Sequence, residues 1–580
     1  MVAIHVAMYI ETVPNRNSPP AILLREGWRE GSKVHKRTIA NITHWPKEQV
    51  EALRRVLKGE LVVSPEEAFA IERSIPHGHV EAILGTIRKL GLDRIIASKG
   101  SRQCNLVLAM IAERLMFPCS KLATTRLWHD STLAEELGVA DATENDLYAA
   151  LDWLLRRQPH IENKLASRHL SEDSMVLYDV TSSYYDGRTC PLVHFGHSRD
   201  GKKGRPIIVY GLLTDKDGCP VSVEVYPGNT ADPTTVPDQV DKLRKRFGIE
   251  RVVLVGDRGM LTQTQIDKLK DHPGLGWISA LRSNAIRKLA DQGALQMSLF
   301  DERTLAEIHT PEFPAERLVA CYNPLLAEER HRKREALLEA TEKDLEKIVR
   351  DVRRRTKKPL DKVAISRRVG KVLYRYKMAK HFSIQIEDSS LSYSRKEESI
   401  KKESELDGIY VIRTSEPEER LSPEDVVRGY KRLSQVERAF RCMKGVEILI
   451  RPIFHRTEAH VRAHIFLCVL AYYVEYHMRK ALKPLLFDDE ELAGDRIIRD
   501  PVAPATPSAS SKRKKRIRRT AEGFEVHSFC SLLGHLATRC RNFCRMKSEA
   551  SDAGFHRVTQ PTPLQEAALR MLGLFPVNGK

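Results

Sequence analysis

The sequence predicts an α/β protein built around one mixed sheet that is flanked by helices and interrupted by a large insertion. Two observations lead to this fold class. Between residues 171 and 284, short apolar strand-like segments alternate with helical ones. Between residues 285 and 415 the alternation stops, and a long, highly charged helical stretch takes its place. At 580 residues the chain is also too long for one typical core, so several domains are expected.

The composition is that of a folded protein that attracts polyanions. Hydrophobic residues make up 42% of the chain and charged residues 30%, which disfavours a disordered chain. The 95 Lys and Arg residues against 77 Asp and Glu residues give a formal net charge of +18. Nucleic acid is the commonest polyanion for such a surplus, although charge alone does not exclude a merely basic cytosolic protein.

Features of membrane and secreted proteins are not found in the sequence. The longest strongly apolar run, residues 465–474, is about half the ~20 residues that span a bilayer. Residues 1–10 have no basic leader and no small-residue cleavage site. The ten cysteines are scattered through the chain, which fits reduced thiols better than disulfides. We therefore expect a cytoplasmic protein without a membrane partner.

Two regions are expected before the sheet. Residues 1–70 predict a small β-rich module, with a basic stretch at residues 33–37 and a helix opened by Pro46. Residues 71–170 carry apolar residues at three- and four-residue spacing, which predicts helices. We interpret this helical region as a DNA-binding domain, with a packing scaffold as the alternative.

The first part of the predicted sheet lies within residues 171–284. Its expected order is three strands, helix, strand, helix and strand, which supports a mixed sheet with helices on its faces and is also the order of the ribonuclease H-like fold. The strands are expected at residues 174–181, 206–214, 220–226, 252–255 and 276–281, and the helices at 233–247 and 262–270.

The remaining sequence divides into four parts. Residues 285–415 are expected to form the inserted domain, a charged helix plus β-strands. Residues 416–485 return to the core with one helix at 423–444 and an apolar helix after it. Residues 486–525 form a predicted linker, because they are too basic and too rich in Pro and Ser to bury a core. Residues 526–580 are predicted to be a helical C-terminal region.

Two Asp residues stand at the ends of apolar strand segments. Asp179 lies near the end of the first strand, and Asp257 directly follows the strand at residues 252–255. In an open sheet, ligands collect beyond the carboxyl ends of the strands. Taken alone, each Asp is more simply a strand-end cap or a turn residue.

A third acidic residue, Glu437, lies on the helix expected after the insertion. At about 100° per residue, Tyr430, Ser434, Glu437, Arg441 and Lys444 share one stripe of that helix. Such a stripe is usually just a solvated face. Here it combines one carboxylate with an aromatic hydroxyl and two cations, which suits a metal site bordered by phosphate contacts.

Three carboxylates suit chemistry on phosphodiesters. The in-line reaction spreads negative charge, and two divalent cations can activate the attacking oxygen and stabilise the leaving one. Ions of the magnesium class prefer oxygen ligands, and they remove the repulsion between crowded carboxylates. We therefore predict that Asp179, Asp257 and Glu437 are catalytic and hold Mg²⁺, for which Mn²⁺ can substitute.

Three motifs in this order resemble a known family. They are Asp-Val-Thr-Ser-Ser from Asp179, Gly-Asp-Arg-Gly-Met around Asp257, and the helix with Tyr430, Glu437 and Lys444. Together with the long insertion they resemble a DDE transposase of a bacterial insertion sequence. More specifically, they resemble the IS-four-type superfamily, whose signature is Y-x2-R-x3-E-x6-K. The Arg of that signature falls at position 433, which is Leu433 here.

The resemblance implies cut-and-paste transposition. Metal-dependent cleavage at the transposon ends would free a 3′-hydroxyl that forms a hairpin, and the reopened end would attack target DNA. The implied partners are double-stranded DNA, as terminal inverted repeats and as target, and a second copy of the chain in a homodimer on DNA. The residues expected at the DNA are Tyr430, Lys444, Arg441, Arg258 and Arg432.

The resemblance also implies that an inserted β-rich domain helps to hold an extruded base near the hairpin. Trp277, Tyr374 and Tyr376 are candidates to stack such a base, although core packing is the usual role of these residue types.

Two other functional classes stay open. A ribonuclease H-like nuclease that cuts without strand transfer would share the three acids but would not need the large insertion. A catalytically decayed, DNA-binding relative of a transposase would keep the charge and the fold, and Leu433 is the feature that favours it. No Walker loop and no dinucleotide fingerprint is present in the sequence, so no nucleotide cofactor is expected.

Other groups of Cys and His residues are weaker candidates for metal sites. Cys530, His535, Cys540 and Cys544 lack the C-x2-C pairs of structural zinc sites, and the last two are more simply one turn of a helix. His460 and His464 are also one turn apart, and we expect them to face DNA or a neighbouring helix.

Overall fold

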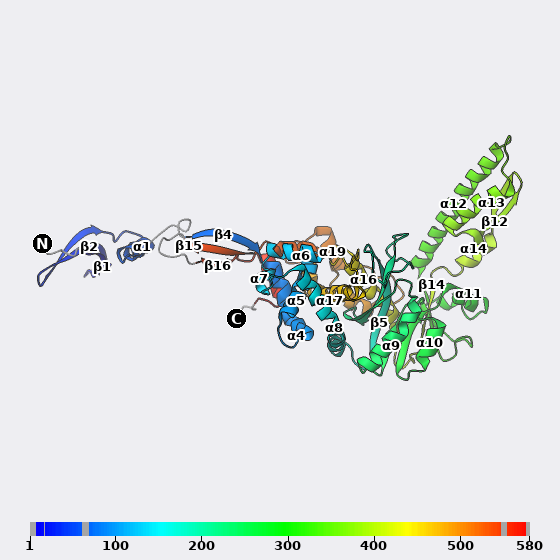
Figure 1. Cartoon of the computed structure of the whole chain (residues 1–580), viewed down its shortest axis with the longest axis horizontal. Coiled ribbons are helices and arrows are strands. Elements are labelled where there is room, and N and C mark those ends of the chain that lie inside the picture. Colours follow the sequence, from blue (N-terminus) through cyan, green and yellow to red (C-terminus); the bar gives the residue numbers. More distant parts are fainter. Residues whose placement is uncertain (1–6, 17, 61–68, 547–553, 576–580) are drawn as a thin grey trace. The chain divides into compact units, whose positions relative to one another are not determined.

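The computed structural model describes residues 7–16, 18–60, 69–546 and 554–575 (Figure 1). The chain forms two compact units. One comprises Met1–Ile75 with Cys540–Gln560, and the other comprises Pro76–Arg539 with Pro561–Lys580. Each unit therefore combines segments from distant parts of the sequence.

The smaller unit contains two three-stranded sheets. The first consists of β1 (Ala7–Val13), β2 (Ala21–Glu30) and β3 (Lys33–Asn41), and it is followed by the helix α1 (Lys47–Leu57). The second consists of β4 (Phe69–Pro76), β15 (Cys540–Met546) and β16 (Gly554–Val558). The basic stretch at residues 33–37 lies in β3. Arg37 pairs with Glu26 of β2 at 2.7 Å, so part of this charge stabilises the sheet across its strands.

The prediction of a wholly helical region at residues 526–580 is wrong, because β15 and β16 lie inside it. Cys540 and Cys544 are strand residues rather than one turn of a helix. The strand's partner explains the error: Arg545 of β15 pairs with Glu72 of β4, 473 residues away, and no local pattern encodes such a neighbour.

The larger unit begins with helices, as predicted. Three of them start at residues whose side chains accept a free backbone N–H of the first turn, namely Ser101, Ser120 and Thr143. Thr143 also forms a capping box with Asp146. The helices are α3 (Gly78–Leu90), α4 (Leu92–Ile96), α5 (Arg102–Met116), α6 (Lys121–Leu127), α7 (Leu133–Glu136) and α8 (Glu144–His169). Their apolar faces belong to the same hydrophobic core as the sheet that follows.

The sheet has eight strands, and its first five follow the predicted order of elements. The elements are β5 (Ser174–Tyr184), β6 (Ile207–Asp215), β7 (Pro220–Tyr226), α9 (Val236–Asp241), β8 (Val252–Val255), α10 (Gln263–Lys270) and β9 (Leu275–Ala280). β5, β8 and β9 are parallel to one another, whereas β6 and β7 run antiparallel as a hairpin. The structure is thus a mixed α/β fold, and the strands run in the spatial order β7-β6-β5-β8-β9.

Three strands from the predicted insertion continue this sheet beyond β9. They are β14 (Ile409–Thr414), β11 (Arg317–Tyr322) and β10 (Leu305–Ile308), all antiparallel to their neighbours. Residues 285–415 therefore do not form one separate domain as predicted. The reason is that β9 would otherwise leave a row of unpaired backbone groups, which β14 satisfies.

The rest of the insertion has a hydrophobic core of its own. It contains α12 (Pro324–Arg354), α13 (Lys362–Tyr376), β12 (Phe382–Glu387), β13 (Ser390–Arg395) and α14 (Glu397–Ser404). Figure 1 shows α12, α13 and β12 side by side. The charged helix predicted from the sequence is confirmed as α12, which at 1.5 Å per residue is about 46 Å long.

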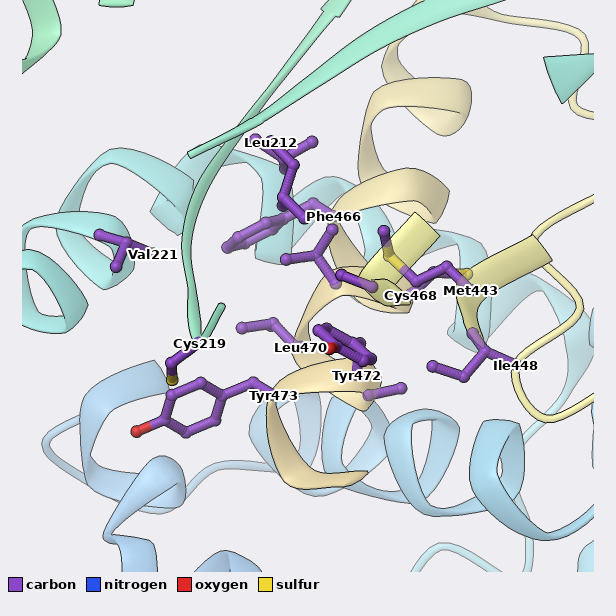
Figure 2. Close-up of a cluster of buried hydrophobic side chains, with 14 of the residues drawn as sticks. Leu212, Cys219, Val221, Met443, Ile448, Phe466, Cys468, Leu470, Tyr472 and Tyr473 are labelled. Carbon is purple, nitrogen blue, oxygen red and sulfur yellow. The ribbon is translucent and has the colours of Figure 1, made fainter. Parts of the chain in front are cut away.

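After β14 the chain returns to the main core in a series of helices. They are α15 (Pro423–Lys431), α16 (Leu433–Lys444), α17 (Glu458–Leu482), α18 (Leu492–Ile498), α19 (Ala509–Ile517), α20 (Phe529–Ala537) and α21 (Pro563–Met571). The expected single helix at residues 423–444 is interrupted at Arg432. Figure 2 shows Phe466 of α17 beside Leu212 of β6, in the middle of the core. In the ranges that the structure describes, no helix combines the length and apolarity needed to cross a membrane.

The predicted linker at residues 486–525 contains two helices, α18 and α19. The expectation that it is too basic and too rich in Pro and Ser to bury a core is wrong, because Val502 is fully buried in the main core. Ser508 caps α19 and is held by Asp489. Lys514 of α19 is buried, and its ammonium donates to the carbonyl oxygen of Lys483 at 3.0 Å and to Glu490 at 2.8 Å. A charged residue is buried here because its partners replace the lost water.

Candidate active site

The register of the sheet brings Asp179 and Asp257 to the same level on neighbouring strands. Leu177 of β5 is paired with Val255 of β8 in the parallel ladder. Asp179 and Asp257 each follow two residues later. Since parallel neighbours lie about 4.8 Å apart, the two carboxylates meet where β8 ends.

Glu437 joins this pair from α16, which packs against β5. The pKa of Asp179 is raised to about 7, first by burial and then by the negative charges of Asp257 and Glu437. The N–H of Val180, which donates to Asp179 at 2.8 Å, and the charge of Arg199 act in the opposite direction. The three predicted acids thus lie close enough to act on one another.

Tyr430, at the end of α15, faces the same group. Burial is the largest cause that raises its pKa to about 12, and all three carboxylates contribute, while the positive charge of Arg258 opposes them. Tyr430 and Arg258 therefore both border the acidic cluster, as the sequence predicted for residues near the DNA.

Hydrogen bonds fix the carboxylate of Asp257. Its Oδ1 accepts the backbone N–H groups of Gly259 at 2.9 Å and Met260 at 2.8 Å. An open depression of about 410 Å³ begins beside it, lined by Asp257, Arg258, Gly259, Arg282, Ser283 and Asn284. The second oxygen, Oδ2, accepts no hydrogen bond from the residues that the structure describes.

The two faces of α16 differ as its periodicity predicts. Val436, Ala439 and Met443 are buried in the core, whereas Glu437 and Arg441 are exposed. Leu433, at the Arg position of the family signature, is only 9% exposed and belongs to the core. An Arg side chain at this position would need a buried partner, so the absence of the Arg fits the packing of this helix.

Lys444 is held inside the protein. Its Nζ donates to Thr181 Oγ1 at 2.8 Å, to the carbonyl oxygen of Ser182 at 2.6 Å and to Asp200 Oδ1 at 2.9 Å. Burial lowers the pKa of Lys444, and the carboxylate of Asp200 counteracts this. Asp200 also pairs with Arg451 and accepts the N–H of Tyr184. We call Lys444, Asp200 and Arg451 the lysine cluster.

Sequence reasoning missed Asp200. It lies in the loop between β5 and β6, without the apolar strand that drew attention to the other two Asp residues. No spacing in the sequence links it to Lys444, 244 residues away.

Arg432 also has a partner within the protein. It donates to Asp217 Oδ1 and to the carbonyl oxygen of Lys216, both at 3.0 Å, and so anchors the start of α16 to the β6–β7 turn. Gly218 in that turn has φ +86°, and a Cβ there would lie 2.6 Å from Gln435, so the close approach requires glycine. In the described part of the chain, neither Arg441 nor Arg258 forms an ion pair.

The aromatic and histidine candidates are distributed differently from the prediction. Trp277 is 1% exposed in β9, so the idea that it stacks an extruded base is wrong. Tyr374 is 83% exposed on α13, and Tyr376 donates its hydroxyl to Asp344 at 2.9 Å. His460 stacks on Tyr148 of α8, which confirms the expectation that it faces a neighbouring helix.

Comparison with known proteins agrees with this arrangement. A family model described as the transposase DDE domain matches residues 179–474, which is just over half of the chain. A second, described as the N-terminal domain of the IS1634 family transposase, matches residues 10–67. Among curated proteins, no match was found.

Among solved structures, the similarity is weak. A cryo-EM structure of a piggyBac transposase synaptic complex with hairpin DNA is 11% identical over 77% of this chain and 80% of that chain. Its TM-score of 0.32 is too low to support an inference. The assignment depends on the two family models, and the longer match spans all three acids and the helices that carry Tyr430 and Glu437. The chain belongs to the DDE transposase family of insertion sequences.

Proposed function

We propose that this transposase cleaves DNA at transposon ends and joins those ends to target DNA at a site formed by Asp179, Asp257 and Glu437. One observation carries the proposal: three carboxylates converge, and within the described residues none of them has an ion-pair partner. The negative charges of Asp257 and Glu437 help to raise the pKa of Asp179, and such a group of unpaired carboxylates is typical of sites that receive a cation.

The residues fit a pair of divalent ions, which transposase DDE domains generally use. Carboxylate oxygens are the ligands that Mg²⁺ and Mn²⁺ prefer, and the cluster offers no nitrogen or sulfur ligand. Bound there, such ions would activate the attacking oxygen and stabilise the leaving oxygen of the phosphodiester.

The protein's own side chains would orient the DNA. Arg258 and Arg441 lie at the rim of the acidic cluster, and each can bind a phosphate oxygen with two N–H groups. Tyr430, half-buried between the acids and the core, would hold a phosphate or sugar with its hydroxyl. Lys444 and Arg432 act indirectly in this proposal, because their internal bonds keep α16 in place.

The strand order supports the further proposal of a ribonuclease H-like core. In the order β7-β6-β5-β8-β9, the first strand along the chain, β5, is central. The antiparallel hairpin of β6 and β7 lies on one side of it, and the parallel strands β8 and β9 lie on the other. This is the arrangement expected for that fold, and the residue matches at Tyr430, Glu437 and Lys444 favour the IS-four-type superfamily within it.

The same resemblance supports cut-and-paste transposition through a hairpin, carried out by a homodimer on paired ends. Tyr374 is the remaining candidate for stacking an extruded base, since its ring is exposed on the part of the insertion that has its own core. A ring held in solvent can stack on a base without disturbing the core.

The proposal is tested with purified protein, Mg²⁺ and DNA that carries candidate terminal repeats. We expect double-strand breaks through a hairpin, followed by joining, and we expect Asp257→Ala to abolish both. Asp271→Ala is the matched control, because Asp271 is an exposed residue of the same type at the end of α10.

Three outcomes would change the assignment. Cleavage that survives Asp257→Ala would reject the acidic cluster as the site. Nicks without hairpins or joining would favour a nuclease without strand transfer. Specific DNA binding without any cleavage would favour a decayed relative of a transposase.

A further inference from the structure

We propose that His169, Cys219 and His477 bind a zinc ion at a second site, separate from the three acids. His169 is the last residue of α8, Cys219 lies in the turn before β7, and His477 is on α17. The potential ligand atoms of the three residues all lie within 4.8 Å of one another. Figure 2 shows Cys219 beside Tyr473, which is one turn before His477 on α17.

The distances match what zinc requires. Cys219 Sγ lies 3.9 Å from His169 Nε2 and 3.7 Å from His477 Nε2. With bonds of about 2.3 Å to sulfur and about 2.05 Å to nitrogen, tetrahedral zinc holds such atoms about 3.6 Å apart. The two sulfur-to-nitrogen distances are therefore within a few tenths of an ångström of that value.

The surroundings orient these ligands. Asp215 Oδ2 lies 4.0 Å from Nδ1 of His169, the ring nitrogen that does not face Cys219. Metal-bound histidines commonly direct their other nitrogen to a carboxylate in this way. Oδ1 of the same carboxylate accepts the N–H of Cys219 at 2.9 Å, so Asp215 fixes the backbone of one ligand and lies near a second.

The charge balance also suits a dication. The cations near the cluster are Arg168 and Lys480, and the acids that face it are Asp215 and Asp217. The hydroxyl of Tyr473 lies 3.0 Å from His169 Nε2 and would give up this hydrogen bond when that nitrogen binds zinc, and a water molecule would complete the tetrahedron.

A second group with similar spacing is less suited to bind a metal ion. Cys442, Glu447 and Glu475 also bring three potential ligands together. The guanidinium of Arg479 already pairs with both carboxylates there, and Glu475 Oε2 accepts the thiol of Cys442 at 3.0 Å. The His169 group contains no such cation bonded to its ligands.

The zinc would tie together segments that are far apart in the sequence. Cys219 is 50 residues from His169 and 258 residues from His477. Because the ligands come together only in the folded chain, zinc binding would stabilise the contact of the helical region with the sheet and α17. Nitrogen and sulfur ligands select zinc over magnesium, so the two sites would not compete for one ion.

The test is a titration of the full-length protein, first stripped with a chelator, with Co²⁺ as the probe. Thiolate ligation gives a sulfur-to-cobalt charge-transfer band, which the oxygen ligands of the acidic cluster cannot produce. We expect a band that saturates at one equivalent, is displaced by Zn²⁺, and is accompanied by a Zn²⁺-dependent rise in the unfolding temperature. Failure of transposition would leave these readouts unchanged, so this test is independent of the proposed function.

Cys219→Ser should remove the band, and Cys468→Ser is the matched control. Cys468 is also buried and lies 3.9 Å from a histidine, His464, but it belongs to no group of three potential ligands among the described residues. Absence of the band in the wild-type protein would overturn the proposal without any variant. A band that persists in Cys219→Ser, or disappears in Cys468→Ser, would also overturn it.

Discussion

Two groups of charged side chains join the same two elements, β5 and α16, and they balance their charges in opposite ways. The acidic cluster combines Asp179 and Glu437 with Asp257, and its charges repel one another. In the lysine cluster, Lys444 lies seven residues after Glu437 on α16 and bonds to Thr181 and Ser182 of β5. Two cations there surround Asp200, a carboxylate that is 1% exposed. The fold thus pairs the charges that fix α16 to the sheet and leaves unpaired those that we assign to the metal ions.

The largest effect is expected from a substitution in the acidic cluster. Asp179→Asn should reduce DNA cleavage on the order of 10³-fold or more, because an anionic ligand of the metal ions that stabilise the transition state is lost. Without metal the same variant should unfold at a higher temperature, because repulsion and the burial of a charge are removed. Cleavage assays and thermal unfolding in a chelator measure the two effects. An active variant, or one that is less stable without metal, would contradict this view.

In the lysine cluster, loss of a carboxylate should lower the stability of the protein instead of raising it. Asp200→Ala removes the carboxylate from Lys444, whose side chain is 10% exposed, and from the partly exposed Arg451, which should lower the free energy of unfolding by about 3–5 kcal/mol. Urea denaturation measures this change. Asp186→Ala is the control, because Asp186 pairs with Arg205, whose side chain is 57% exposed, and its loss should cost under about 1 kcal/mol. Equal effects of the two changes would show that burial does not decide the strength of these pairs.

Glu113 on α5 adds a third case to the comparison. It is a buried carboxylate that belongs to neither cluster and has no cation bonded to it among the described residues. Burial is the main cause that raises its pKa to about 8, and among the described residues neither carboxylate oxygen has a hydrogen-bond partner. Because the folded pKa lies above the unfolded one, stability is full below about pH 4.5 and is lost as the pH rises towards 8.

Glu113→Gln removes this loss. Its stability relative to the wild type should increase by about 3 kcal/mol between pH 4.5 and pH 7, as 2.5 pH units at 1.36 kcal/mol each imply. Denaturation at a series of pH values measures the difference, with Glu329→Gln, an exposed position on α12, as the control. A difference that does not depend on pH would mean that Glu113 is not protonated in the folded protein.

The smallest effect is expected for Arg441→Ala. Arg441 is exposed beside Glu437, so its loss should weaken DNA binding only a few-fold and reduce the salt dependence of binding by about one ion. Binding measured at several salt concentrations gives both values, and folding should be unchanged. Lys444→Met, by contrast, should lower stability before it affects the salt dependence, because its partners lie inside the protein.

Much of the candidate site could be predicted because it depends on local patterns. Asp179 and Asp257 follow apolar strand segments, and the 3.6-residue period placed Glu437 on the polar side of its helix. The roles of Lys444 and Arg432 could not be read in this way. Lys444 lies on the polar stripe of the predicted helix and Arg432 at its edge. Whether a cation at such a position contacts DNA or a group of the protein depends on a loop or turn from another part of the chain.

The sequence by itself determined the order of the strands and helices between residues 171 and 284 and the apolar face of α16, and it predicted the three acids, because these follow from periodicity and from strand ends. Only the tertiary structure decided the pairing of Leu177 with Val255, the burial of Leu433, the place of β15 beside β4, and the meeting of His169, Cys219 and His477. The physical reason is that these neighbours are separated by tens to hundreds of residues, and their contacts are selected by the packing of the whole core rather than by any local preference.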